Sequence, residues 1–142
     1  MYYGAIEAGG TKFRAAVYRN GEKIKEMTIA TRDPETTLEP VACFLGSYPL
    51  KAVGLGAFGP IILDENDPDY GLITETPKEK WRQFNIYRYC AERLRVPVYL
   101  DTDVGVAALG EYFAAGGTAQ NIVYVTVGTG IGIGVIVDGK IF

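Results

Sequence analysis

The sequence predicts an α/β fold in which helices flank a mixed sheet, followed by the first hairpin of a second unit of the same kind. One observation is an internal repeat. Shifted by 118 positions, the chain repeats itself without a gap at three places: Gly10-Thr11 with Gly128-Thr129, Val17 with Val135, and Asn20-Gly21 with Asp138-Gly139. Between the copies, short apolar runs alternate with segments of helical composition. A hydrophobic content of 48% over 142 residues is ample for a core.

Each copy of the repeat predicts a β-hairpin that begins with a buried strand. Residues 3–6 and 122–125 are apolar runs, and the glycines after them permit a tight turn with positive φ. Such a turn exposes backbone N–H groups that can approach an anion closely, and the later Asn-Gly or Asp-Gly pair is a strong hairpin signal. A single copy is more simply a hairpin without a ligand. Two copies favour a device that cradles phosphate.

The segment after the first hairpin predicts a third strand and a helix. Residues 22–30 form the strand, and residues 31–37 form a turn. We expect Thr36 or Thr37 to be the helix N-cap, because this choice places Pro40 in the first turn, where its missing N–H costs nothing.

Residues 51–57 form the next predicted strand. Residues 54–59 happen to match the G-x-G-x-x-G pattern of dinucleotide-binding folds, but that fingerprint requires a helix at the third glycine, and the chain here continues extended. We therefore reject the match. Phe58, Gly59 and Pro60 instead form a turn at the carboxyl end of a strand, the edge at which open α/β sheets bind ligands.

The middle of the chain predicts a loop, a helix and a strand. The acidic run at 64–71 is typical of a solvated loop rather than a metal site. We expect Trp81 to pack beneath its loop, with contact to a sugar as the alternative. A helix is predicted over 85–95 and a strand over 98–100.

Asp103 lies between that strand and a predicted helix over 104–115. Strand alternation places Asp101 and Asp103 on one face. The local sequence leaves two roles open for Asp103. It is either an N-cap, satisfied by helix N–H groups, or a general base.

The composition excludes several classes of partner. A net charge of −3, a pI near 5.0 and scattered basic residues argue against a nucleic-acid surface. No apolar window approaches the roughly 18 residues of a membrane span, and no signal peptide is evident, so we expect a cytoplasmic protein that does not contact membranes. Cys43 and Cys90 are isolated, which predicts two reduced, buried thiols.

Several motifs together resemble the ROK family of sugar kinases and repressors, in the hexokinase and actin-like superfamily. Residues 6–13 (IEAGGTKF) resemble its first phosphate motif in the form found in the fructokinase branch, where Glu7 replaces the commoner aspartate. Residues 124–141 resemble the second phosphate motif. Three further segments are similar in order and spacing: GAFGP at 56–60, TPKEKW at 76–81 and LDTDVGVAALGE at 100–111.

The resemblance implies an actin-like ATPase (ribonuclease H-like) fold whose two domains hold ATP between them. Residues 1–118 would be the N-terminal domain on the sugar side, and residues 119–142 the opening hairpin of a second domain. Many family members hold a zinc ion with one His and three Cys, but this sequence contains no histidine and no such motif.

The resemblance also implies roles for individual residues. Asp103 accepts the proton of the attacking sugar hydroxyl, Glu7 contacts hydrated Mg²⁺, and Lys12 either neutralises charge or forms a structural ion pair. The ATP phosphates are assigned to two glycine turns: Gly9, Gly10 and Thr11, and Gly128, Thr129 and Gly130. The sugar is assigned to Phe58, Gly59, Pro60, Thr102 and Asp103.

Two positions depart from the family pattern. Thr102 and Gly105 occur where family members usually have Asn. Thr102 can still donate a hydrogen bond to a sugar hydroxyl, but Gly105 cannot. The departure therefore concerns sugar affinity or specificity and leaves the base intact.

The predicted function is ATP-dependent phosphorylation of a hexose hydroxyl, with fructose favoured and mannose or glucose open. The second copy of the repeat ends at Phe142, where its third strand would begin, so we expect the 142 residues alone to be inactive and to self-associate as a homo-oligomer through residues 121–142. A non-catalytic sugar or nucleotide sensor, a domain fragment that only binds, and an actin-like assembly module are the alternatives.

Overall fold

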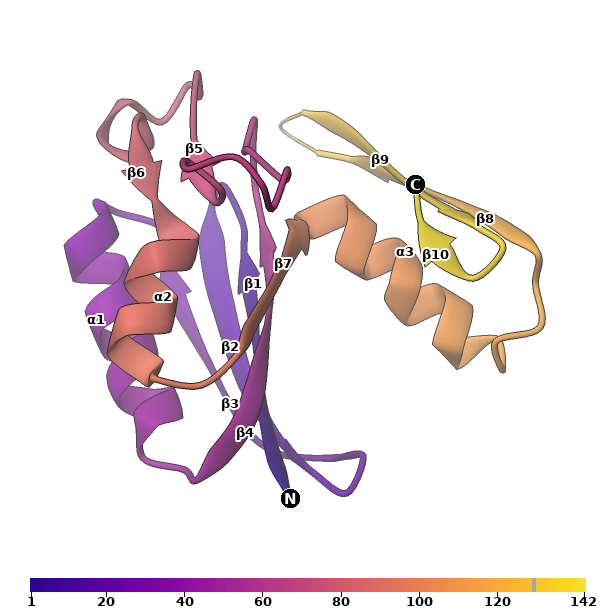
Figure 1. The fold of residues 1–142 in the computed structure, drawn as a ribbon, viewed down its shortest axis with the longest axis horizontal. Helices are drawn as coiled ribbons and strands as arrows, with labels where there is room; N and C mark the ends of the chain where they lie inside the picture. Colours follow the sequence, from indigo (N-terminus) through magenta and orange to yellow (C-terminus); the bar gives the residue numbers. More distant parts are fainter. Residues whose placement is uncertain (129) are drawn as a thin grey trace.

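A five-stranded mixed sheet forms the larger part of the computed structural model, which describes residues 1–128 and 130–142 (Figure 1). In the order β3-β2-β1-β4-β7, its strands are β3 (Glu22–Ala30), β2 (Lys12–Arg19), β1 (Tyr2–Ala8), β4 (Leu50–Ala57) and β7 (Val98–Thr102). The first three strands along the chain are antiparallel, while β4 and β7 run parallel to β1. The carboxyl ends of β1, β4 and β7 therefore meet at one edge, and the predicted α/β fold is confirmed.

Helices α1 (Pro34–Gly46) and α2 (Ile86–Leu94) cover one face of this sheet (Figure 1). The short elements β5 (Leu72–Ile73), η1 (Glu79–Trp81) and β6 (Phe84–Asn85) lie between β4 and α2 in the chain. The core between sheet and helices is apolar and fully buried, and its largest members are Trp81, Phe13, Leu38, Leu45, Leu55, Ile73 and Ile86. Among the described residues, no helix combines the length and apolar character that crossing a membrane requires.

Helix α1 begins earlier than the sequence predicted. Asp33 is the N-cap, and its side chain accepts a hydrogen bond from the Thr36 N–H at 2.9 Å. Pro34 takes the first helical position, where its fixed φ suits the helix. Pro40 consequently lies inside α1, so the carbonyl four residues earlier loses its amide partner. Thr37 is buried, and its hydroxyl accepts from the Arg32 N–H instead of capping the helix.

The second turn of each hairpin has the predicted conformation. Asn20 and Gly21 have φ values of 53° and 85°, and Asp138 and Gly139 have 49° and 76°. Two successive positive φ angles are typical of the tight turn that suits the twist of paired strands. The sequence also predicted a positive φ in the glycine turn after β1. That prediction was wrong, because neither Gly9 nor Gly10 has a positive φ.

The two cysteines differ in exposure. Cys90 in α2 is buried as expected, and burial raises the pKa of its thiol to about 12. Cys43 in α1 is exposed, contrary to the prediction, because it lies off the helix face formed by Leu38, Val41 and Leu45. Both thiols are free.

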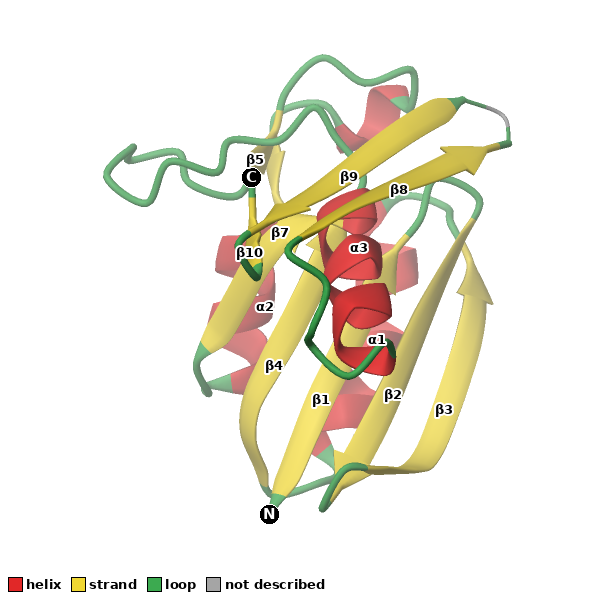
Figure 2. Cartoon of the chain, turned by 90° about the vertical axis from the view of Figure 1, so that its right-hand side faces the viewer, coloured by secondary structure: helices red, strands yellow, loops and turns green. Residues whose placement is uncertain are grey.

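Helix α3 (Asp103–Ala114) lies between the large sheet and a second sheet of β8 (Asn121–Val127), β9 (Ile131–Val137) and β10 (Lys140–Ile141) (Figures 1 and 2). Glycine allows the close contact on both sides. A β-carbon at Gly56 in β4 would overlap the Val106 side chain, and one at Gly134 in β9 would overlap the Val104 carbonyl. Helix α3 is therefore packed against both sheets at positions that have no side chain.

The face of the second sheet away from α3 exposes apolar side chains. Val125 is 54% exposed and Ile133, its partner across the β8–β9 pair, is 58% exposed. Val127 and Ile131 form the next pair and are each 76% exposed. An apolar stripe of this kind on a sheet usually packs against another layer.

The close approach at Gly56 can be tested by adding a methyl group. Gly56→Ala should lower the free energy of unfolding by about 1–3 kcal/mol, because the methyl group would overlap Val106. Gly54 faces the same side two residues earlier, and a β-carbon there meets no atom within 4 Å. Gly54→Ala should therefore be neutral or stabilising by up to about 1 kcal/mol. Urea unfolding measures both, and equal losses would contradict the packing of α3 on β4.

Candidate active site

The predicted site residues follow three neighbouring strands at the same edge of the sheet. Ala8, Ala57 and Thr102 end β1, β4 and β7 and are aligned in register across them. The segments that come next are the first glycine turn, the turn at residues 58–60 and the start of α3. Parallel strands thus bring together residues that lie far apart in the sequence.

The first glycine turn is held closed by backbone contacts. The Gly9 N–H donates to the Lys12 carbonyl at 3.1 Å, and a β-carbon at Gly9 would lie 2.7 Å from that oxygen. Thr31 braces the turn from the end of β3, since its hydroxyl donates to the Gly9 carbonyl at 2.8 Å and its N–H to the Thr11 carbonyl at 3.0 Å. Glycine is thus required at position 9 for space and not for a positive φ.

A cavity of about 380 Å³ adjoins this turn. It is lined by Gly10, Thr11, Phe58, Gly59, Thr76, Pro77 and Lys78. The structure thereby joins the predicted phosphate residues to two of the predicted sugar residues. Pro60 comes next in the chain, is exposed, and accepts the Thr74 N–H at its carbonyl at 2.9 Å.

Two aromatic residues pack together beside this cavity, and one of them, Phe58, lines it. Trp81 is 1% exposed, and its indole N–H donates to the Arg32 carbonyl at 2.6 Å, which confirms that Trp81 packs beneath its loop. Phe58 is 8% exposed and meets Trp81 edge-on, with ring centroids 5.5 Å apart. The Phe58 ring therefore belongs mainly to the core and shapes the cavity wall.

Asp103 is the first residue of α3 and not its N-cap. Thr102 caps the helix, because its hydroxyl oxygen accepts the Gly105 N–H at 3.0 Å. The Asp103 carboxylate instead accepts the N–H of Val104 at 2.9 Å. Asp103 is therefore not the N-cap, although its carboxylate satisfies one of the free N–H groups in the first turn of α3.

The surroundings of Asp103 raise its pKa above the ordinary value. Partial burial is the main cause, because it disfavours the charged form, and the negative charge of Glu7 acts in the same direction. The hydrogen bond from the Val104 N–H opposes both. A carboxylate with a raised pKa accepts a proton more readily, which suits a general base.

Glu7 lies on β1 on the face that α3 covers. Gly56 is its register partner in β4, and a β-carbon at Gly56 would lie 3.4 Å from the Asp103 Cα. The Glu7 carboxylate is 4.0 Å from the Arg14 guanidinium. Lys12 is exposed and takes no part in the ion pairs between described residues. The structural ion pair predicted as one of its two roles is therefore not formed among these residues.

The carboxylates fit one mode of magnesium binding. Mg²⁺ usually keeps several waters and takes one or two carboxylates besides substrate phosphates. Glu7 and Asp103 offer two carboxylates on one face, whereas no cluster of three His, Cys, Asp or Glu residues able to enclose a metal occurs among residues 1–128 and 130–142. The residues therefore suit a hydrated ion held jointly with phosphate.

Gly128 and Gly130, in the second glycine turn, have free space beside them. The Gly128 N–H donates to the Gly130 carbonyl at 2.8 Å, and β-carbons at these two glycines would meet no atom within 4 Å. Thr129 lies outside the described residues. The end of β8 and the start of β9 lie at the same end of the molecule as the first turn (Figures 1 and 2).

Gly105 is buried beside Asp101. A β-carbon at Gly105 would overlap the Asp101 Oδ1 and lie 2.9 Å from the Thr102 hydroxyl. Asp101 Oδ1 in turn accepts the Thr102 N–H at 2.6 Å. With Asp101 in this position, the asparagine usual in the family has no room, so the departure at Gly105 is linked to the placement of Asp101.

Comparisons with known proteins agree with this fold. The family model described as ROK family matches residues 3–142. A fructokinase from Lactococcus lactis subsp. cremoris is 42% identical over 140 residues, which cover 98% of this chain and 48% of that protein. A fructokinase from Pediococcus pentosaceus is 41% identical over 144 residues, which cover 100% of this chain and 50% of that protein. The chain thus spans about half the length of these relatives.

Solved structures show the same architecture. A ROK family glucokinase from Streptomyces griseus in complex with glucose and AMPPNP has a TM-score of 0.82 and 27% identity, and the match covers 100% of this chain and 46% of the other. A ROK hexokinase from Thermus thermophilus has a TM-score of 0.79 and 29% identity, covering 100% and 49%. These similarities and the fold define the class: the chain has the actin-like ATPase fold of ROK sugar kinases. It belongs to the ROK family.

The raised pKa of Asp103 predicts a cost to stability at neutral pH. A carboxyl group of this kind contributes stability that is full below its ordinary pKa of 3.8 and is lost as the pH rises through the folded-state pKa. Asp103→Asn removes the charge and keeps an oxygen that can accept the Val104 N–H. The variant should therefore be more stable than wild type at pH 7, and the difference should vanish near about pH 3. Urea unfolding at the two pH values measures it, and a less stable variant at pH 7 would contradict it.

Proposed function

We propose that the protein phosphorylates a hexose hydroxyl with ATP, and that fructose is its preferred sugar. The observation that carries the proposal is the position of Asp103, a partly buried carboxylate with a raised pKa at the sheet edge that also carries the first glycine turn. Two relatives at 41–42% identity are fructokinases, which supports the choice of sugar. The glucokinase complex with glucose and AMPPNP supports a hexose and a nucleotide as co-substrates.

Phosphoryl transfer requires positioning and charge stabilisation more than covalent chemistry from the protein. We assign the phosphates to the two glycine turns, at residues 9–11 and 128–130, through N–H groups other than those of Gly9 and Gly128, which already donate to carbonyls. Asp103 accepts the proton of the sugar hydroxyl as that oxygen attacks the terminal phosphate. Mg²⁺, when bound through Glu7, supplies positive charge to the phosphates.

We assign the sugar to the loop at residues 58–60 and to Thr102. The backbone at Gly59 borders the cavity next to Gly10 and is our first candidate for sugar contact. Thr102 is a weaker candidate, because its hydroxyl already accepts the Gly105 N–H and donates to Asp101 at 3.3 Å. Sugar specificity would then depend more on the loop at residues 58–60.

We also propose a division into two domains, with residues 1–118 on the sugar side and residues 119–142 opening the nucleotide side. The exposed apolar face of β8 and β9 supports this division, because that face requires another layer to cover it. In the 142 residues alone the face is free to pair with a second copy. The proposal therefore includes an inactive, self-associating state of this chain.

The role of Asp103 as base predicts a large kinetic effect. A suitable context is a chimera that joins residues 1–142 to the remaining half of the Lactococcus lactis fructokinase, its relative at 42% identity. There, Asp103→Asn should lower kcat for fructose by about 10²- to 10⁴-fold with little change in sugar affinity. Coupled ADP formation and calorimetric titration with fructose measure the two quantities. A variant with near-normal kcat would remove Asp103 from the mechanism.

The chain of 142 residues should form no ADP in the presence of fructose, mannose or glucose, and it should elute as an oligomer. The expected oligomer follows from the uncovered apolar face of the second sheet. The expected lack of ADP follows from the proposed division, in which residues 119–142 only open the nucleotide side. Coupled ADP formation together with light scattering checks both statements. A monomer that turns over fructose would overturn the inactive state, while sugar binding without turnover in the chimera would favour a sensor over a kinase.

A further inference from the structure

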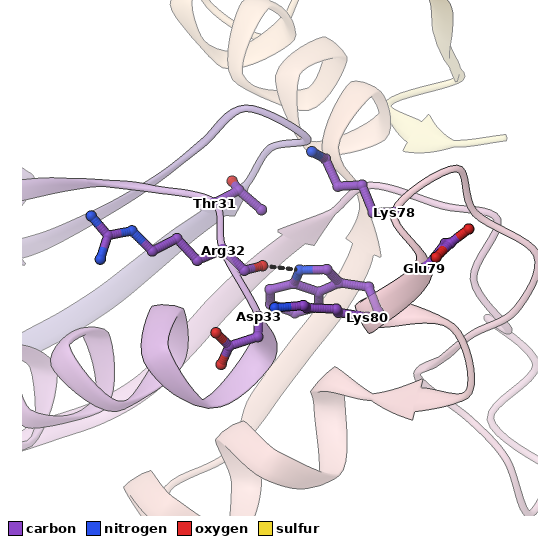
Figure 3. A pocket seen from close by; sticks show the side chains of 7 residues that line it. Thr31, Arg32, Asp33, Lys78, Glu79 and Lys80 are labelled. Carbon is purple, nitrogen blue, oxygen red and sulfur yellow. Dashed lines mark hydrogen bonds between the residues drawn. The ribbon is translucent and has the colours of Figure 1, made fainter.

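Lys78 lies against the first glycine turn although it is distant from that turn in the sequence. The Lys78 Cε is 3.2 Å from the position that a β-carbon of Gly10 would take, and both residues line the 380 Å³ cavity. In Figure 3 the Lys78 side chain extends away from both Asp33 and Glu79. The sequence contained this residue within the TPKEKW motif but offered no local signal for its role.

The loop that carries Lys78 is firmly held. The Lys78 carbonyl accepts the Trp81 N–H at 2.8 Å, and the Trp81 indole is hydrogen-bonded to the Arg32 carbonyl. The Arg82 side chain donates to the Thr76 carbonyl at 2.7 Å, and Thr76 is only 3% exposed. A fixed backbone at both ends of the loop reduces the conformational entropy that Lys78 loses when its ammonium group binds a ligand.

The charge of Lys78 is not engaged with a carboxylate in the described part of the chain, where the ion pairs join other residues. The side chain of Lys80, two residues later, points in a different direction from that of Lys78 (Figure 3). The Lys80 side chain extends toward Asp33 (Figure 3), and its positive charge helps to lower the pKa of that carboxyl group. Both lysines border a second cavity of about 550 Å³, but only Lys78 also borders the cavity of the glycine turn.

We propose that Lys78 binds the terminal phosphates of a nucleoside triphosphate held at the first glycine turn. The proposal rests on the proposed function, since it takes the turn at residues 9–11 to be the phosphate cradle. Backbone N–H donors and an ammonium group on one cavity wall form a site for a polyanion, and lysine is a common point charge in such sites. Phe58 and Gly59 share the cavity, so Lys78 lies on the side from which the sugar would approach.

The test uses the 142-residue chain labelled with ¹⁵N and titrated with ATP, with AMP and with inorganic tripolyphosphate. Lys78→Met keeps the apolar stem and removes the charge, Lys78→Arg keeps the charge, and Lys80→Met is the matched control in the same loop. In the wild-type chain, ATP and tripolyphosphate should shift the amide signals of residues 9–11. Lys78→Met should weaken ATP binding about tenfold, a loss of ~1.4 kcal/mol, while Lys80→Met changes it less than about twofold.

Two further measurements separate a ligand contact from a structural role. Lys78→Arg should bind ATP within about threefold of wild type, and Lys78→Met should leave both AMP affinity and the melting temperature nearly unchanged. Equal losses in Lys78→Met and Lys80→Met would overturn the role of Lys78 and leave the phosphate turn intact. An absence of ATP-dependent shifts at residues 9–11 in the wild-type chain would overturn both Lys78 and the turn, but not the role of Asp103.

Discussion

The contact of α3 with two strands at glycine positions determines where the candidate base lies. Gly56 leaves room for Val106 on one side, and Gly134 leaves room for the Val104 carbonyl on the other. Because protein interiors are close-packed, a helix held on both sides at these distances has little freedom to shift. Asp103 begins this helix, so the position of its carboxyl group relative to the β1 turn depends on these two contacts.

Glycine has two different physical uses in this chain, and they explain one failure of the sequence analysis. Gly21 and Gly139 adopt positive φ in their turns, and the Asn or Asp that precedes each makes this visible in the sequence. At Gly9 the requirement is space beside the Lys12 carbonyl. A dipeptide pattern indicates a backbone conformation, whereas a neighbour that excludes a side chain is known only once the chain has folded.

Local chemistry was sufficient for the order of the longer helices and strands. It was insufficient for the short elements β5, η1, β6 and β10 and for the choice between adjacent polar residues. The strands of the large sheet and the hairpin turns followed from apolar runs and turn residues, but Asp33, Thr36 and Thr37 could all cap α1. In the structure Asp33 is the N-cap. The Thr37 hydroxyl is buried and accepts the Arg32 N–H instead. At α3 the sequence left Asp103 as either N-cap or general base, and the structure has Thr102 at the N-cap instead. The contact of Lys78 with Gly10 depends on loop packing through Trp81, which no short motif expresses.

The distribution of charge at the sheet edge explains why a cation is needed on the side of Lys78. Glu7 lies on the sheet face that α3 covers, Asp103 begins that helix, and the negative charge of Glu7 adds to the effect of burial in raising the pKa of Asp103. A polyphosphate at the neighbouring turn would add several negative charges to the same region. Arg14 can offset the charge of Glu7, since its guanidinium lies 4.0 Å from that carboxylate, but Arg14 does not line the cavity. In the proposed site, an ammonium group on the cavity wall would let the phosphates approach while Asp103 remains basic enough to take a proton.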